Sequence, residues 1–184
     1  MRRVAALLLP LLLAGCALMS GAATDNTAVA ELKDARGGEV GVASFTQVGR
    51  AVSIVLTAKG LPPGQHGVHV HEIGKCDPPT FTSAGGHFNP GHKQHGAQNP
   101  QGSHAGDLPN LTIDPDATGR LETVTEQLRL GPGSTSIFDA DGSALIIHAQ
   151  PDDFHTDPTG NSGARIACGV ITKVPPKREA ASTY

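Results

Sequence analysis

The stretch Val52-Ser53-Ile54-Val55-Leu56-Thr57-Ala58 decides the fold class, because its side chains alternate in character. Four apolar residues share one face of an extended chain: Val52, Ile54, Leu56 and Ala58. Ser53 and Thr57 fall on the opposite face. A period of two with one apolar face is typical of an antiparallel strand that is buried on one side. The stretch therefore predicts a sheet.

The same period recurs upstream, at Ala28, Ala30 and Leu32. Turn signals such as Asp139-Ala140-Asp141-Gly142 separate further strand candidates. These candidates are residues 40–47, 66–72, 107–113, 119–127, 143–149 and 165–172. No segment of useful length has the period of a helix, and there is no internal repeat. We predict an all-β domain with eight antiparallel strands in a β-sandwich or barrel.

Composition agrees with one β domain and excludes a nucleic-acid partner. The 184 residues suffice for one domain, and 23 Gly and 14 Pro favour short strands joined by turns. The formal charge is −3, and no Lys/Arg run offers a phosphate-binding surface. Nine His form the unusual excess.

The N-terminus carries the features of an export signal. Arg2 and Arg3 precede an apolar run, residues 4–14, that is too short to span a bilayer. The run ends in Leu13-Ala14-Gly15-Cys16, which resembles the lipobox of bacterial lipoproteins, where cleavage precedes a lipidated Cys. The alternative is an ordinary signal peptide with an incidental Cys. We therefore expect an exported protein, lipid-anchored to a membrane of the bacterial cell envelope, on its periplasmic or outer face.

These signals divide the chain into four parts. Residues 1–15 are expected to be a signal peptide cleaved before Cys16, and residues 16–26 a flexible tether. Residues 27–174 form the folded domain, and residues 175–184 are expected to be a disordered tail. Because exported thiols meet an oxidising compartment and Cys16 is expected to carry lipid, Cys76 and Cys168 remain as a disulfide pair. Two free buried thiols are the alternative.

Two stretches, residues 73–106 and 149–164, are long and irregular for a compact β domain. Loops of this length are usually functional or disordered. Because they contain more than half of the histidines, which bind metals readily, we interpret them as functional loops that build a site.

The segment His69-Val70-His71 lies in a strand pattern, so its two imidazoles project from one face. His148 follows an apolar run at another strand end and can supply a third nitrogen. Imidazole clusters suit copper, zinc, iron or nickel. Alone, the His-x-His pattern is equally compatible with a surface or structural pair.

The first long loop contains a second group of metal-binding side chains: His87, His95, His104 and Asp107. Three His and one carboxylate are typical of a closed tetrahedral zinc site of structural type. The alternative is a solvated polar segment with unrelated histidines.

Four motifs in order carry a resemblance that covers residues 28–173. They are Gly67-Val68-His69-Val70-His71-Glu72, Gly85-Gly86-His87-Phe88-Asn89-Pro90, Ser103-His104-Ala105-Gly106-Asp107-Leu108, and residues 160–171 (GNSGARIACGVI). The chain resembles the copper/zinc superoxide dismutases, in a bacterial lipoprotein form. That family is a known example of the immunoglobulin-like sandwich, so the resemblance implies a Greek-key arrangement of the strands.

The resemblance implies two metals and the residues that hold them. Copper ligands match His69, His71, His87 and His148. Zinc ligands match His87, His95, His104 and Asp107, so His87 bridges the two ions. His87 and Arg165 match the catalytic pair, the first as a proton carrier and the second as the group that holds superoxide. Asp152 matches the carboxylate that links a copper ligand to a zinc ligand, and Cys76 and Cys168 match the family's disulfide.

The implied activity converts two superoxide anions and two protons to oxygen and hydrogen peroxide. A catalytically silent copper-binding or copper-delivery protein of the same fold is the alternative, and an adhesion sandwich is a weaker one. His95 is preferred over His92 as the zinc ligand because Gly96 follows it, and His66 and His155 are expected to face solvent. A homodimer is compatible with the sequence, but the contacts of eukaryotic members do not transfer.

Overall fold

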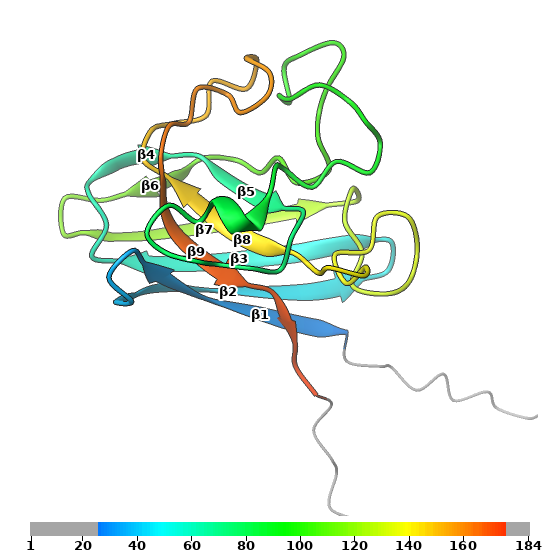
Figure 1. The fold of residues 1–184 in the computed structure, drawn as a ribbon, viewed down its shortest axis with the longest axis horizontal. Coiled ribbons are helices and arrows are strands. Elements are labelled where there is room, and N and C mark those ends of the chain that lie inside the picture. Colours follow the sequence, from blue (N-terminus) through cyan, green and yellow to red (C-terminus); the bar gives the residue numbers. More distant parts are fainter. Residues whose placement is uncertain (1–25, 176–184) are drawn as a thin grey trace, which may run out of the picture.

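The computed structural model describes residues 26–175, which form an all-β domain (Figure 1). The strands are β1 (Thr27–Asp34), β2 (Glu39–Val48), β3 (Ala51–Lys59), β4 (Gly64–His66), β5 (Val68–His71), β6 (Leu111–Ile113), β7 (Thr118–Thr125), β8 (Ala144–His148), β9 (Arg165–Val170) and β10 (Thr172–Lys173). One short 3-10 helix, η1 (Thr82–Ala84), lies in the first long loop. Within residues 26–175, no helix has the length and apolar character needed to cross a bilayer.

The strands form one antiparallel sheet that is nearly closed into a barrel. Its order is β4-β6-β7-β3-β2-β1-β9-β8-β5, with β10 paired to β1. The two ends of this path, β4 and β5, are consecutive in the chain and are separated only by Gly67. Gly67 donates its N–H to Gln150 O and accepts from His148 N, so the chain changes partners there. The predicted all-β antiparallel fold is confirmed.

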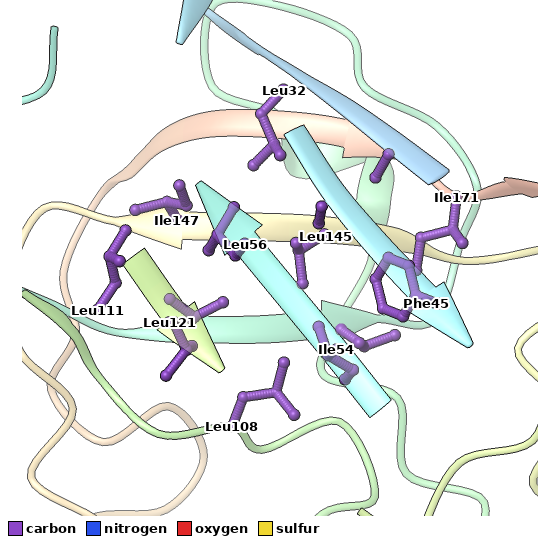
Figure 2. Close-up of a cluster of buried hydrophobic side chains, with 14 of the residues drawn as sticks. Leu32, Phe45, Ile54, Leu56, Leu108, Leu111, Leu121, Leu145, Ile147 and Ile171 are labelled. Carbon is purple, nitrogen blue, oxygen red and sulfur yellow. The ribbon is translucent and has the colours of Figure 1, made fainter. Parts of the chain in front are cut away.

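The alternating residues of the predicted strands fill the barrel (Figure 2). Phe45 from β2, Ile54 and Leu56 from β3, and Leu145 from β8 are almost completely buried in one cluster. Burying each such side chain contributes roughly 1.5–3 kcal/mol. The barrel interior is therefore a packed core, and the site lies outside it.

The outer face of β8 and β9 is also buried, because the first long loop covers it. A small cluster there contains Ala144 and Ile146 from β8, Cys168 from β9, and Phe81 and Ala84 from the loop. Because the loop covers the outer face of β8, both faces of this strand are buried. This explains its continuous run of apolar residues, since a strand with one face in solvent would alternate apolar and polar residues. The loop is thus packed onto the barrel beside the strands that carry His71 and His148.

Eight predicted strands correspond to ten observed ones. The candidate at residues 66–72 is divided at Gly67 into β4 and β5, and the candidate at 165–172 is divided into β9 and β10. The candidate at 107–113 begins as a strand only at Leu111. The two long functional loops are observed at residues 72–110 and 149–164, and a third irregular connection spans residues 126–143. The expected signal peptide, lipidated Cys16 and most of the expected tether and tail lie outside the described residues.

Candidate metal centre

Four histidines converge between the barrel and its two loops. His69 and His71 lie on β5, His148 ends β8, and His87 comes from the first loop, where it bridges to His71. One ring nitrogen of each can lie within 4.8 Å of the others. His69 Nδ1, His71 Nε2, His87 Nε2 and His148 Nε2 are all buried and have no hydrogen-bond partner. Buried polar atoms normally have a partner, so four unpaired nitrogens facing one another fit a metal ion.

The second nitrogen of each ring is held by the protein. His71 Nδ1 donates to Gly85 O at 3.0 Å, and His148 Nδ1 donates to Gly163 O at 3.1 Å. His69 Nε2 donates to Asp152 Oδ2 at 2.8 Å. Such contacts fix which nitrogen of a ligating His is free to bind metal. The structure therefore presents the predicted copper group with its donor atoms already selected.

A second group of donors adjoins the first through His87. Asp107 Oδ1 lies 3.0 Å from His87 Nδ1, 3.0 Å from His95 Nδ1 and 3.4 Å from His104 Nδ1. His69 also lies near enough to be grouped with His87, His95 and Asp107. We assign His104 to this group in place of His69. In His69, Nε2 donates to Asp152 and Nδ1 faces the copper group, so neither nitrogen is left for a second metal. Three imidazoles and one carboxylate suit tetrahedral zinc.

Asp152 joins the two groups, as the resemblance implied. Its Oδ2 accepts from His69 and its Oδ1 accepts from His95 at 2.9 Å. Asn110 holds the backbone of Asp152 through a pair of hydrogen bonds at 2.8 and 2.9 Å. Gly160 packs so closely that a Cβ there would lie 2.6 Å from His95 Nε2 and overlap the Asp152 carboxylate. Sequence reasoning found Asp152 but missed Asn110 and Gly160, whose roles depend on loops that meet only in the fold.

Burial and nearby charges shift the pKa values of the histidines in different directions. Burial lowers the pKa of His148 to about 3 and that of His87 to about 4, so both rings are neutral donors. Burial also opposes protonation of His95, but its hydrogen bonds to Asp107 and Asp152 outweigh that effect and raise its pKa. Two buried carboxylates thus favour a positive charge beside His95. A divalent ion supplies such a charge, and the zinc group fits it.

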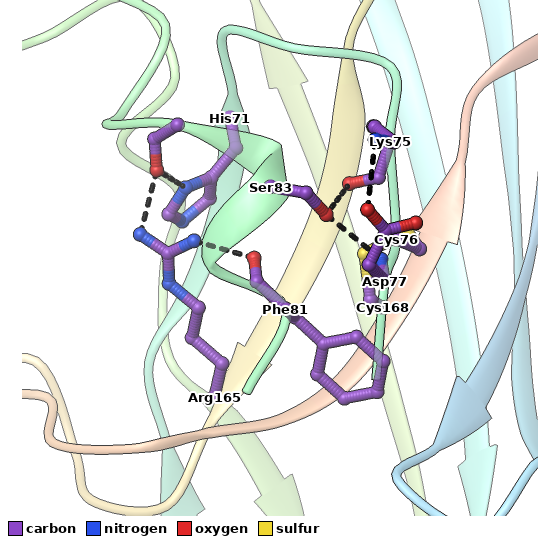
Figure 3. Close-up of a disulfide and its surroundings, with 9 residues drawn as sticks. His71, Lys75, Cys76, Asp77, Phe81, Ser83, Arg165 and Cys168 are labelled. Atoms are coloured by element: carbon purple, nitrogen blue, oxygen red, sulfur yellow. Dashed lines mark hydrogen bonds and ion pairs between the residues drawn. A yellow bond between two sulfur atoms is a disulfide. The ribbon is translucent and has the colours of Figure 1, made fainter. Parts of the chain in front are cut away.

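Arg165 opens β9 beside the copper group, opposite His148 in the sheet. Its guanidinium donates to Phe81 O and to Gly85 O, each at 2.6 Å, and the same Gly85 carbonyl accepts from His71 Nδ1. Figure 3 shows Arg165 lying beside His71 and Phe81. The predicted disulfide between Cys76 and Cys168 is confirmed, and it fastens the same loop to β9. Arg165 is thus within the network of the copper ligands.

The remaining histidines were predicted with mixed success. His92 is exposed and His95 is buried, which agrees with the choice of His95, and His155 is exposed as expected. The expectation that His66 faces solvent is wrong, because only 3% of it is exposed. Its ring lies between His148 O at 2.7 Å and Pro62 O at 2.8 Å. In the sequence, His66 is a single His in a strand pattern. Nothing in that pattern indicates that two carbonyl oxygens lie beside its ring.

The fold and the two adjoining donor groups define a β-barrel protein built to hold two metal ions side by side. Residues 39–171 match the family model of copper/zinc superoxide dismutase (SODC). The chain is 47% identical over 163 residues to superoxide dismutase [Cu-Zn] 2 of Aquifex aeolicus (strain VF5), covering 86% of this chain and 95% of that protein. The chain belongs to the copper/zinc superoxide dismutase family.

Further relatives agree with this assignment. Superoxide dismutase [Cu-Zn] of Caulobacter vibrioides is 40% identical over 148 residues, which are 79% of this chain and 85% of that one. The crystal structure of a superoxide dismutase-like protein from Bacillus subtilis matches with a TM-score of 0.74 and 43% identity, covering 77% of this chain and 95% of that chain. The predictions of an oxidoreductase of this family, with copper and zinc as its metals, are confirmed.

Proposed function

We propose that the protein dismutates superoxide in the bacterial cell envelope, giving oxygen and hydrogen peroxide, and that it protects the envelope from superoxide. The observation that carries the proposal is the set of four buried, unpaired nitrogens of His69, His71, His87 and His148. Copper, when bound there, would supply one-electron chemistry, because it alternates between two oxidation states whereas zinc does not. The zinc group would be structural.

The chain's own residues would bind the anion and manage protons. Arg165 keeps a permanent positive charge beside the copper group and has several donors, so it can hold superoxide there. His87 offers Nε2 to the copper group and Nδ1 to the zinc group, so its ring joins them. When Nε2 is free, it can hold a proton and give it to the peroxide product. The contacts of Nδ1 keep the ring in place meanwhile.

Location is a separate part of the proposal. The lipobox-like sequence that ends at Cys16 supports export and anchoring of the mature chain by lipid. The proposed site of the activity is therefore the periplasmic or outer face of a membrane, and the lipobox-like sequence is what supports it.

Metal analysis together with a dismutation assay on the purified protein tests the activity. We expect activity to require copper, and the protein to lose part of its activity when zinc alone is removed. Full activity in protein that contains zinc but no copper or other redox metal would contradict the proposal. A silent copper-binding or copper-delivery protein is the second candidate, because a structural relative is itself described as superoxide dismutase-like. It predicts copper bound at the site without dismutation.

A further inference from the structure

Asp157, in the loop 149–164, reaches across to the zinc group on the other long loop. Its Oδ1 accepts the backbone N–H of His95 at 2.5 Å, a contact between residues 62 apart in sequence. The same oxygen lies 3.8 Å from His104 Nε2. One carboxylate oxygen therefore contacts the main chain of one zinc ligand and faces the imidazole of another.

The outer nitrogen of His104, Nε2, faces one carboxylate in the described part of the chain. Within residues 26–175, Asp157 is the only acidic side chain within 4.0 Å of His104 Nε2. The corresponding outer nitrogens of His69 and His95 face Asp152. An acceptor at this position fixes the ring of a metal-binding His and makes it a stronger donor. At 3.8 Å the Asp157 carboxylate is too far from His104 Nε2 for a hydrogen bond, so it acts on this ring through its negative charge, whereas Asp152 accepts a hydrogen bond from His95 Nε2 at 2.9 Å.

We propose that Asp157 is a positioning residue of the zinc group, which sets how tightly the loop 72–110 holds zinc. The proposal rests on the zinc set of the proposed function, although not on dismutation itself. Asp157 lies beside zinc ligands only, whereas Asp152 also contacts His69 of the copper group. A change at Asp157 should therefore weaken zinc binding and leave the copper group intact.

Asp153 is a matched control in the same loop. Its carboxylate accepts from His155 N at 2.9 Å, Thr156 N at 2.8 Å and Asn161 Nδ2 at 2.9 Å, all within its own loop. None of these partners is a proposed metal ligand. Loss of the Asp153 carboxylate would loosen the loop without removing a contact to His95 or His104.

The experiment measures zinc release from protein loaded with copper and zinc, using a chromophoric chelator in competition. Asp157→Ala removes both the hydrogen bond to His95 N and the charge that faces His104, and it should raise the zinc dissociation constant by roughly ten- to a hundredfold. Asp157→Asn keeps an oxygen for the His95 N–H but loses the charge facing His104, so its effect should be smaller. Asp153→Asn should release zinc as the unchanged protein does. Copper release should be the same in all four proteins.

Several results would overturn the proposal. One is zinc release from Asp157→Ala that matches the unchanged protein. Another is equal weakening of zinc and copper binding in the Asp157 and Asp153 variants, which would mean a general loosening of the loop. A wild-type protein that takes up no zinc would remove the zinc set and this proposal with it. Wild-type protein that binds zinc but does not dismutate superoxide would contradict the proposed function alone, since zinc release would still be measurable.

Discussion

At the scale of single residues, Arg165 combines structural hydrogen bonds with a positive charge beside the copper group. Its two hydrogen bonds to Phe81 O and Gly85 O brace the loop that also supports His71. It also carries charge in a chain of formal charge −3, and the loop 149–164 contains no Lys that could attract an anion. Under the proposed function, Arg165 and the bound metals would therefore supply much of the local attraction for superoxide.

We expect Arg165→Ala to lower the second-order rate of dismutation by roughly ten- to a thousandfold, because focused fields change association rates by that factor. Arg165→Glu should lower it further, and its rate should depend less on salt or rise with it. Stopped-flow rates over a range of ionic strength measure both effects. Copper and zinc content must be determined alongside, because the lost bonds to the loop could release metal. A fully metallated Arg165→Glu protein with the wild-type rate and salt dependence would show that another residue captures the anion. The first residue to test would be Lys93, an exposed cation of the loop 72–110.

Residues with a chemical signature could be predicted from sequence, and residues that only support them could not. The metal-binding side chains stand in recognisable motifs such as His69-Val70-His71, so their grouping was available before the fold. Asn110 and Asp157 lie outside those motifs, and their partners are 42 to 62 residues away in sequence. His66 was misplaced for the same reason. Such contacts depend on how the loops meet.

At the scale of elements, alternation predicted where strands run but not where they change partners. Residues 66–72 have the composition of one strand, yet the chain pairs with β6 before Gly67 and with β8 after it. The connection 126–143 was not given a role, although Leu128, Leu130 and Ile137 in it are fully buried. Periodicity within a segment carries no information about which distant element covers it.

The disulfide is an element-scale contact, since it fastens the loop 72–110 to β9. Cys76→Ser should lower thermal stability and activity together, because the bridge closes a separation of 92 residues and the same loop carries His87. Loop-closure entropy corresponds to about 4–5 kcal/mol of unfolding free energy. Calorimetry of the metal-loaded variant, beside the unchanged protein under reducing and oxidising conditions, measures the effect. Equal melting temperatures for reduced and oxidised protein would contradict it.

At the scale of the whole molecule, the barrel separates the metal centre from the ends of the described chain. Figure 1 shows β1 beginning, and the described chain ending, toward the bottom of the view, whereas the later part of the loop 72–110 (green) and the loop 149–164 (orange) rise at the top. The contacts that build both donor groups lie within residues 66–165. The start of β1 at Thr27 is therefore a separate part of the described domain from the residues that build the metal centre.

This arrangement makes the proposed anchor testable independently of the chemistry. We expect Cys16→Ser to release the protein from membranes while its dismutation rate and metal content stay unchanged, because no described contact of the site involves residues before Thr27. Fractionation of cells, followed by assays of the membrane and soluble fractions, measures both properties. The expectation assumes more than one acyl chain on Cys16, since a single chain binds membranes only marginally. Wild-type protein found entirely in the soluble fraction would show that Cys16 carries no anchor, and the family assignment would be unaffected because it rests on residues 39–171.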